Sequence, residues 1–225
     1  QLPWLLSRQA NLPLRRLPRT LGLTFDVDTP ADLWILGLHP GCGRRVKGFL
    51  EGDSRLRRLE QARAVLLDAG AEVFIAGRVS GRQLRFLDER TRCRLRVLSE
   101  ERGMKALGLE ARGEVTSLLG FWVEQVSPEA FFESLAQCCS AAFIDTRPLL
   151  AHRGRRVPPD ERLASDLGQW QSVQDPLVRR FTKAAWQAPF PVILGGHSLV
   201  TGGLWALLDG AQEAASEEAG GKVSN

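Results

Sequence analysis

The stretch Ala71-Glu-Val-Phe-Ile-Ala-Gly-Arg-Val-Ser80 decides the fold class of this 225-residue chain. It holds a short apolar run that ends in a polar turn, and a polar helix is expected to follow at residues 81–91. Similar strand-like runs at 94–98, 141–144 and 191–194 also end in polar or glycine residues and are separated by helical patterns. This alternation predicts an α/β fold: a mostly parallel sheet of about four to five strands flanked by helices.

Helical patterns fill the spaces around these runs. Leucine and alanine residues between positions 55 and 69 lie on one stripe, and Gly70 is expected to end that helix. Before it, Gly22 to Asp28 is expected to form a short strand, and Thr29-Pro30 is expected to start a helix. Further helices are expected at residues 114–125, 127–139, 160–186 and 204–215.

The composition is that of an ordinary globular chain, with 44% hydrophobic and 25% charged residues. No run approaches the roughly 18 apolar residues that cross a bilayer, and no signal-peptide pattern follows Gln1, so no membrane partner is expected. The four cysteines fit neither a disulfide framework nor a zinc site, which favours reduced thiols in the cytoplasm. The 30 basic residues are scattered among 26 acidic ones, which argues against nucleic acid as the main partner.

One short segment resembles a known family. Leu23-Thr-Phe-Asp-Val-Asp-Thr-Pro-Ala-Asp-Leu33 is similar to the closing strand and helix of the nucleotidyltransferases that make molybdenum-cofactor dinucleotides, and to the 2-phospholactate guanylyltransferases. In such enzymes an acidic or amide residue on this strand helps to hold the Mg²⁺ that bridges the nucleotide phosphates. The resemblance therefore implies that Asp26 and Asp28 are metal ligands, and carboxylate oxygens suit that ion.

The resemblance also has a limit, which shapes the expected domain organisation. The glycine-rich loop and lysine that cradle the triphosphate in that family are absent upstream, and Arg102-Gly-Met-Lys105 has similar letters in the wrong order and place. Residues 1–45 are therefore interpreted as the C-terminal remnant of a nucleotidyltransferase-like domain. Residues 46–215 are interpreted as an α/β domain whose strands begin near Ala71, and residues 216–225 as a disordered tail.

Polar or glycine residues follow all four predicted strands. Ligands of open α/β sheets bind outside the carboxyl ends of the strands, so these residues are expected to converge on one rim. The predicted ligand-binding residues are Arg78, Ser80, Glu101, Arg102, Thr146, Arg147, Gly195, Gly196, Ser198 and Gly202, and the predicted catalytic residues are Asp145 and His197.

The sharpest element of this rim is the stretch from Gly195 to Gly203. Two glycines after a strand let successive backbone N–H groups approach an anion, and Ser198 and Thr201 could add hydroxyl donors. The alternative is a tight turn with a glycine contact for close helix packing, because the spacing matches neither a P-loop nor a dinucleotide fingerprint. His197 is suited to general acid–base work, although a lone loop histidine more often bonds only to backbone.

Asp145, one of the predicted catalytic residues, has an open role. Asp145 directly follows an apolar strand, where a metal- or ribose-binding carboxylate often lies. The alternative for Asp145 is an ion pair with Arg147 or Arg153. Asp166, in contrast, is expected only to interrupt or cap a helix, together with the serine before it.

These observations lead to two functional hypotheses. In the first, the chain is a fragment of a metal-dependent nucleotidyltransferase-like protein, and its accessory α/β domain binds a nucleotide or another phosphorylated or anionic small molecule. This fragment is not expected to transfer nucleotides alone, and Mg²⁺ is its implied cofactor. In the second, the α/β domain is a non-catalytic binding or regulatory module. The sequence leaves the substrate and the oligomeric state open.

Overall fold

Four parallel strands form one sheet in the computed structural model, which describes residues 6–13 and 21–209. The strands are β1 (Glu72–Gly77), β2 (Arg94–Ser99), β3 (Ala141–Asp145) and β4 (Val192–Gly195). Their order across the sheet is β2-β1-β3-β4, and Val73 in β1 lies opposite Leu95 in β2 and Ala141 in β3. The predicted α/β fold with a parallel sheet is confirmed.

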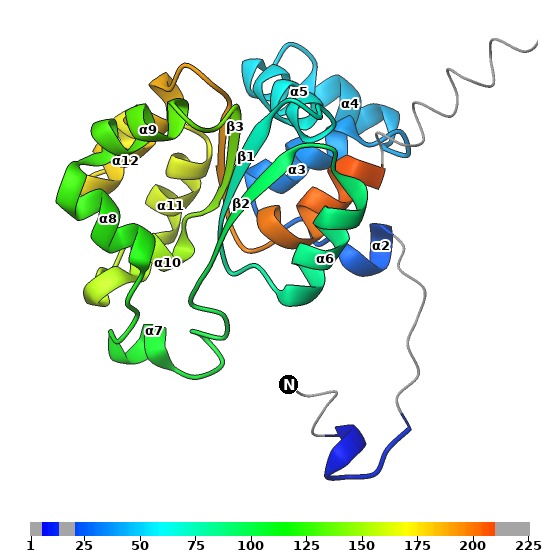
Figure 1. Cartoon of the computed structure of the whole chain (residues 1–225), viewed down its shortest axis with the longest axis horizontal. Helices are drawn as coiled ribbons and strands as arrows, with labels where there is room; N and C mark the ends of the chain where they lie inside the picture. Colours follow the sequence, from blue (N-terminus) through cyan, green and yellow to red (C-terminus); the bar gives the residue numbers. More distant parts are fainter. Residues whose placement is uncertain (1–5, 14–20, 210–225) are drawn as a thin grey trace, which may run out of the picture.

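Helices cover both faces of the sheet, so the molecule has three layers (Figure 1). One face carries α3 (Pro30–Leu38), α4 (Arg44–Leu50), α5 (Ser54–Leu66), α6 (Gly81–Arg90), and η3 (Leu199–Gly203) with the helical residues 204–209. The other face carries α8 (Leu118–Val126), α9 (Pro128–Ala136), α10 (Arg147–Ala151), η1 (His152–Gly154), α11 (Pro159–Asp166), η2 (Trp170–Ser172) and α12 (Pro176–Gln187). No helix in the described ranges is long and apolar enough to span a bilayer.

Alternation along the strands produces the two cores of this sandwich. Val73 and Ile75 point into the core beneath α3, α5 and η3, whereas Phe74 and Ala76 point into the core beneath α8, α9 and α12. Successive strand residues face opposite sides, so a strand that is apolar on both faces must be covered on both. This explains why continuous apolar runs marked the central strands in the sequence.

Short polar residues begin several of the helices. The Ser80 hydroxyl accepts a hydrogen bond from the Gln83 backbone N–H at 3.0 Å and caps α6. The Asp32 carboxylate accepts from the Thr29 backbone N–H at 2.7 Å, which holds the first turn of α3. These bonds satisfy backbone donors that lack a partner inside the helix.

The structure also corrects several expected elements. The strand predicted at residues 22–28 is wrong: α2 (Leu21–Thr24) is helical, and 25–28 run without regular structure to α3. The helices α4, α7 (Leu109–Arg112) and α10 were not predicted, and the long helical region from residue 160 divides into α11, η2 and α12. Residues 210–215 of the last predicted helix and the predicted tail at 216–225 lie outside the described residues.

Side chains from both sides of the predicted boundary at residue 45 share one hydrophobic core. Trp34 and Ile35 of α3 belong to the same buried cluster as Ile75 of β1 and Leu199 of η3. The origin of the first 45 residues in a nucleotidyltransferase domain stays a prediction. Their described part nevertheless packs directly on the sheet, beside the ends of β3 and β4.

Candidate functional site

The strand order creates a topological switch point between β1 and β3. From β1 the chain continues to β2 on one side, and from β3 it continues to β4 on the other. The connections that leave β1 and β3 therefore diverge, and ligands of open α/β sheets bind in the crevice between such ends. Arg78 directly follows β1, and Asp145 is the last residue of β3.

Arg78 and Asp145 form a buried ion pair at this switch point. Arg78 donates from Nε to Asp145 Oδ2 at 2.6 Å and from Nη2 to Oδ1 at 3.0 Å, and its backbone N–H adds a third bond at 3.3 Å. The Asp145 side chain is fully buried, and that of Arg78 is 12% exposed. Two parallel bonds to one carboxylate fix the plane of the guanidinium. The predicted ion pair of Asp145 with Arg147 or Arg153 is thus wrong in its partner.

Gly77 permits this close approach of β1 to Asp145. Its φ is +121°, a conformation that residues with a Cβ rarely adopt, and a Cβ here would overlap the Asp145 side chain. The backbone shape of Gly77 therefore belongs to the geometry that positions Arg78.

A second arginine is fixed in the same way beside the first. Arg147 donates from Nη1 to Asp166 Oδ1 at 3.0 Å, from Nη2 to Oδ2 at 2.6 Å, and from Nη1 to the Thr146 hydroxyl at 2.8 Å. The Asp166 side chain is fully buried and that of Arg147 is 13% exposed. Burial opposes the charge of Arg147, but the hydrogen bonds and charge of Asp166 outweigh it, so the pKa of Arg147 is raised.

The glycine loop after β4 faces the open side of Arg147. A Cβ on Gly196 would lie 3.8 Å from Arg147 Nη2 and 3.9 Å from its Nε, so the glycine leaves space beside these donors. The loop leads into η3, a π-helical turn, and such turns are frequent at functional sites. The Ser198 Oγ is buried and has no hydrogen-bond partner among the described residues.

These parts surround one hollow, which we call the rim pocket. It has a volume of about 510 Å³, within the range of small-molecule sites. Its lining consists of Asp26, Asp28, Thr29, Arg78, Lys105, Arg147, Gly196, His197, Ser198, Thr201 and Gly202. Eight of the fourteen residues predicted from the sequence thus line a single pocket.

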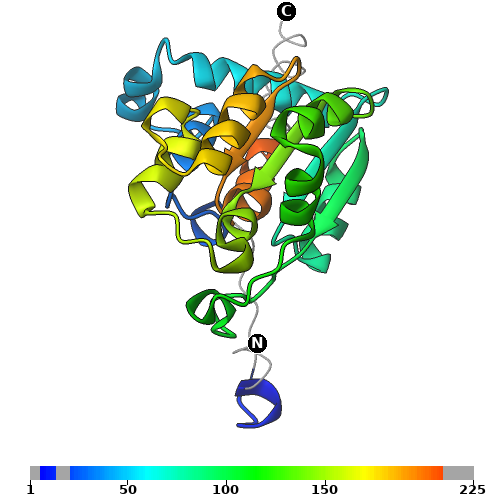
Figure 2. The ribbon, with the colours of Figure 1, turned by 90° about the vertical axis from the view of Figure 1, so that its left-hand side faces the viewer.

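A second hollow, which we call the basic recess, adjoins the rim pocket. It has a volume of about 490 Å³ and is lined by Arg78, Arg102, Gly103, Met104, Lys105, Ala106, Leu107 and His197. Arg78, Lys105 and His197 line both hollows. The basic recess is formed largely by the segment after β2, which extends beyond the carboxyl edge of the sheet in two perpendicular views (Figures 1 and 2).

His197 lies where the two hollows meet. The surrounding protein takes the imidazole partly out of water, and the positive charge of Arg78 adds to this effect, so the pKa of His197 falls below its ordinary value of 6.5. The ring is therefore mostly neutral at pH 7. A neutral imidazole can accept a proton or donate a hydrogen bond, and the predicted catalytic role of His197 stays a prediction.

Asp26 and Asp28 reach the rim pocket from the segment before α3. Both are exposed, and neither forms an ion pair with another described residue. The described residues contain no group of three histidine, cysteine or acidic side chains that could hold a metal ion. Two carboxylates suit a Mg²⁺ ion that takes its remaining ligands from water and a bound phosphate.

The other predicted site residues lie behind or beside the rim pocket. The Thr146 hydroxyl donates to the carbonyl of Gly195 at 3.2 Å, which ties the end of β4 to β3, and Ser80 caps α6. Glu101 lines neither hollow and has a φ of +52°. Burial and the neighbouring Glu100 raise the pKa of Glu101. Asp145 is covered by Arg78 and does not line the rim pocket, so the contact that the structure shows for Asp145 is one that holds Arg78 in position.

Sequence reasoning assigned no binding role to Asp166, Lys105 or Thr29, although Thr29 and Lys105 line the rim pocket. Asp166 was expected only to cap or interrupt a helix, yet it fixes Arg147. Lys105 was dismissed because its segment did not match the family pattern, yet it lines both hollows. The signal available for Lys105 was the position of its segment directly after β2. No sequence signal pairs Asp166 with Arg147.

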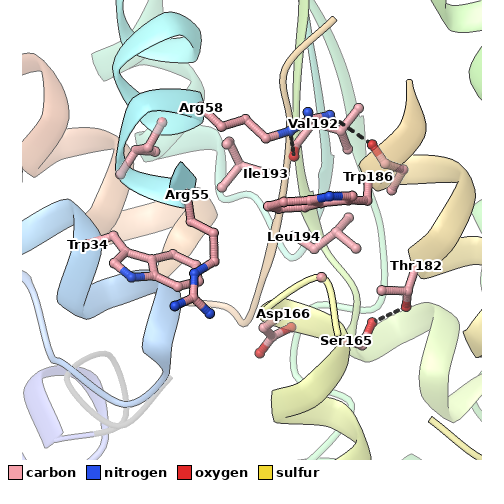
Figure 3. A pocket seen from close by; sticks show the side chains of 13 residues that line it. Trp34, Arg55, Arg58, Ser165, Asp166, Thr182, Trp186, Val192, Ile193 and Leu194 are labelled. Carbon is pink, nitrogen blue, oxygen red and sulfur yellow. Dashed lines mark hydrogen bonds between the residues drawn. The ribbon is translucent and has the colours of Figure 1, made fainter. Parts of the chain in front are cut away.

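A different hollow lies along the outer side of β4 (Figure 3), and we call it the edge cleft. Trp34 with Arg55 forms one wall and Trp186 with Arg58 the other, and Asp166 lies at its lower end. Arg58 donates to the carbonyls of Ala185 at 2.9 Å, Phe190 at 3.1 Å and Val192 at 3.2 Å. The cavity of about 20 Å³ has room for roughly one water molecule.

Comparison with known proteins gives no relative from which a function could be transferred. No protein-family model matches the chain, and neither the curated proteins nor the solved structures include a significant match. The function is therefore inferred from the geometry of the rim.

Proposed function

We propose that the chain binds a phosphorylated small molecule in the rim pocket. The observation that carries this proposal is the pair of arginines, Arg78 and Arg147, each fixed by a buried aspartate and both lining one pocket beside a Gly-Gly loop. Planar guanidinium groups with fixed orientation match phosphate oxygens, and preorganisation lowers the entropy lost on binding. The free donors of Arg147 and the backbone of Gly196 would hold the phosphate.

Mg²⁺ is part of the proposal. Asp26 and Asp28 would hold the ion in the rim pocket, where it would neutralise phosphate charge. The resemblance of residues 23–33 to nucleotidyltransferases supports a nucleotide as the phosphorylated molecule. We also retain the cytoplasmic location that the cysteine pattern predicts.

A thermal-shift screen of nucleotides and sugar phosphates, followed by calorimetric titration, tests the binding proposal. Arg147→Ala should weaken binding by about tenfold to a hundredfold, because hydrogen bonds to charged groups are lost. Gly196→Val should abolish binding by filling the space beside Arg147 while keeping the Arg147–Asp166 pair.

Two matched variants serve as controls for this experiment. Lys183→Ala removes an exposed charge on α12, and Gly43→Val adds the same side chain where no atom lies within 4 Å of a Cβ. Both should bind as the unmodified chain does. If no phosphorylated compound raises the melting temperature, or if Gly196→Val binds normally, the proposal is wrong.

Metal-dependent nucleotidyl transfer is the second candidate, and the presence of Asp26 and Asp28 in the rim pocket favours it. An Asp26→Asn/Asp28→Asn variant should lose any increase in affinity that Mg²⁺ gives to a nucleotide. Binding of a nucleotide without turnover would support the binding module. Nucleotide turnover by this chain alone would instead support the enzyme.

A further inference from the structure

Four exposed charges at the rim have no ion-pair partner among residues 6–13 and 21–209. Asp26 and Asp28 line the rim pocket, Arg102 lines the basic recess, and Lys105 lines both hollows. Arg78 and Arg147 are each neutralised by a buried aspartate. The unpaired positive charge of the basic recess therefore comes from Arg102 and Lys105.

The basic recess has no acidic residue in its lining. Its four ionisable side chains are Arg78, Arg102, Lys105 and His197, and Glu101 lines neither this recess nor the rim pocket. An uncompensated positive charge inside a concave surface attracts anions, because the low-dielectric walls focus its field. The basic recess is thus a second place for an anionic group, next to the one at Arg147.

The segment that carries Arg102 and Lys105 is anchored at two points, Glu100 and Met104. Met104, between them, is 1% exposed and packs in a small core with Val115. The Glu100 carboxylate accepts hydrogen bonds from the Ser117 hydroxyl at 2.7 Å and from the Leu118 backbone N–H at 2.6 Å. These anchors hold the two cations beside the pocket, so they are part of the folded rim.

We infer that the ligand carries two separated anionic groups, one held by Arg147 and Gly196 in the rim pocket and the other by Arg102 and Lys105 in the basic recess. This inference rests on the proposed function of the rim pocket. The shared lining by Arg78, Lys105 and His197 makes the two hollows continuous, so one molecule can occupy both. Molecules of this class include bisphosphates, nucleoside diphosphates, and phosphates that carry a carboxylate.

A series of inorganic phosphates of increasing length tests the inference on the whole chain. Orthophosphate, pyrophosphate and tripolyphosphate are titrated by calorimetry at constant ionic strength, with EDTA present so that Asp26 and Asp28 cannot act through a metal. The readout is the ratio of tripolyphosphate to orthophosphate affinity. We expect a ratio above about tenfold, which corresponds to a second anion site, and a fall to below about threefold in Arg102→Ala/Lys105→Ala.

The control is Arg85→Ala/Lys183→Ala, which removes the same two charge types from exposed positions that line neither hollow. This variant should keep the full ratio. If orthophosphate binds through Arg147 but the ratio is small, or if both double variants lower it equally, the two-anion inference is overturned while the proposed function stands. If orthophosphate and every other phosphate fail to bind, both fail.

Discussion

The rim pocket and the edge cleft both contain arginines that are largely withdrawn from water, but these arginines have different partners. At the rim, Arg147 pairs with the buried carboxylate of Asp166. In the edge cleft, Arg58 donates to backbone carbonyls, and its guanidinium carbon lies over the Trp186 ring at 5.2 Å from the ring centroid. Burial lowers the pKa of Arg58, whereas Asp166 raises that of Arg147.

This difference indicates which arginines are available to a ligand. A carboxylate takes one edge of a guanidinium and leaves the other edge oriented toward open space, as at Arg147. At Arg58, three backbone carbonyls accept hydrogen bonds from Nε and Nη2, so this edge of the guanidinium is bound to the protein itself. The cavity volumes support this distinction, since the rim pocket has about 510 Å³ and the edge cleft only about 20 Å³. Arg58 is therefore structural, and Arg147 is positioned to bind.

The largest effect is expected from Asp166→Asn. The change leaves Arg147 largely buried beside a neutral amide, so the free energy of unfolding in urea should fall by about 3 kcal/mol. Glu129→Gln, which breaks an exposed pair with Arg180, should have no measurable effect. A loss below about 1 kcal/mol for Asp166→Asn would show that the buried pair at the rim stabilises the fold no more than an exposed pair does.

An Arg147→Met/Asp166→Leu variant separates stability from binding. Replacing both members of a buried pair by apolar residues is often neutral, so most of the stability should return. Phosphate binding should stay lost, because the fixed donors are gone. If the double variant still binds phosphate, the rim arginine is not the binding group.

Gly77→Ala should have the next largest effect. Its φ of +121° and the overlap with the Asp145 side chain force a shift of the Arg78–Asp145 pair. We expect a loss of about 2 kcal/mol in the free energy of unfolding, together with weaker phosphate binding. Gly81→Ala is the control, since no atom lies within 4 Å of its Cβ position and the residue begins α6. Equal effects of the two changes would contradict the positioning role of Gly77.

Arg58→Met tests the other side of the comparison. The loss of its hydrogen bonds to carbonyls should lower the free energy of unfolding by about 1.5 kcal/mol, without changing phosphate affinity. Arg57→Met is its matched control, because Arg57 is the exposed neighbour on α5. Weaker phosphate binding in Arg58→Met, with Arg57→Met unaffected, would make the edge cleft part of the binding site.

The smallest effect is a pH dependence of anion binding through His197. Its lowered pKa leaves the ring neutral at pH 7, and a bound anion favours the protonated form. Affinity for sulfate, which does not titrate in this range, should therefore rise by at most about tenfold as the pH falls below 6.5. His197→Asn should flatten the calorimetric pH profile, and an unchanged profile in this variant would assign the effect to another group.

The sheet could be predicted from the sequence because each buried strand is marked by neighbouring apolar residues in the chain. The run 72–76 became β1 at Glu72–Gly77, and 141–144 became β3 at Ala141–Asp145. Continuous apolar runs bounded by polar turns identify strands that are buried on both faces. The false strand at 22–28 shows the limit, since a short run with apolar residues at alternate positions forms a strand only where a neighbouring strand is available to pair with it.

The site was predicted in part for the same reason. The carboxyl ends of parallel strands meet at one edge, so residues after each strand, such as Arg78 and Arg147, could be grouped without coordinates. Asp166 ends α11 and reaches Arg147 only because α11 packs beside β4, a tertiary contact that no spacing encodes. The pairing of Asp145 with Arg78, across 67 positions, was hidden in the same way.

The hydrogen bonds of Arg58 also affect whether a strand of a second molecule can pair with the edge of the sheet. In the described part of the chain, β4 has β3 on one side and no strand on the other. An open strand edge is a template for pairing with another chain, and proteins blunt such edges with charged side chains. By occupying the outward carbonyl of Val192, Arg58 places a cation where an incoming strand would have to bond. Together with the other walls of the edge cleft, Arg58 therefore protects the outer edge of β4 from intermolecular sheet extension.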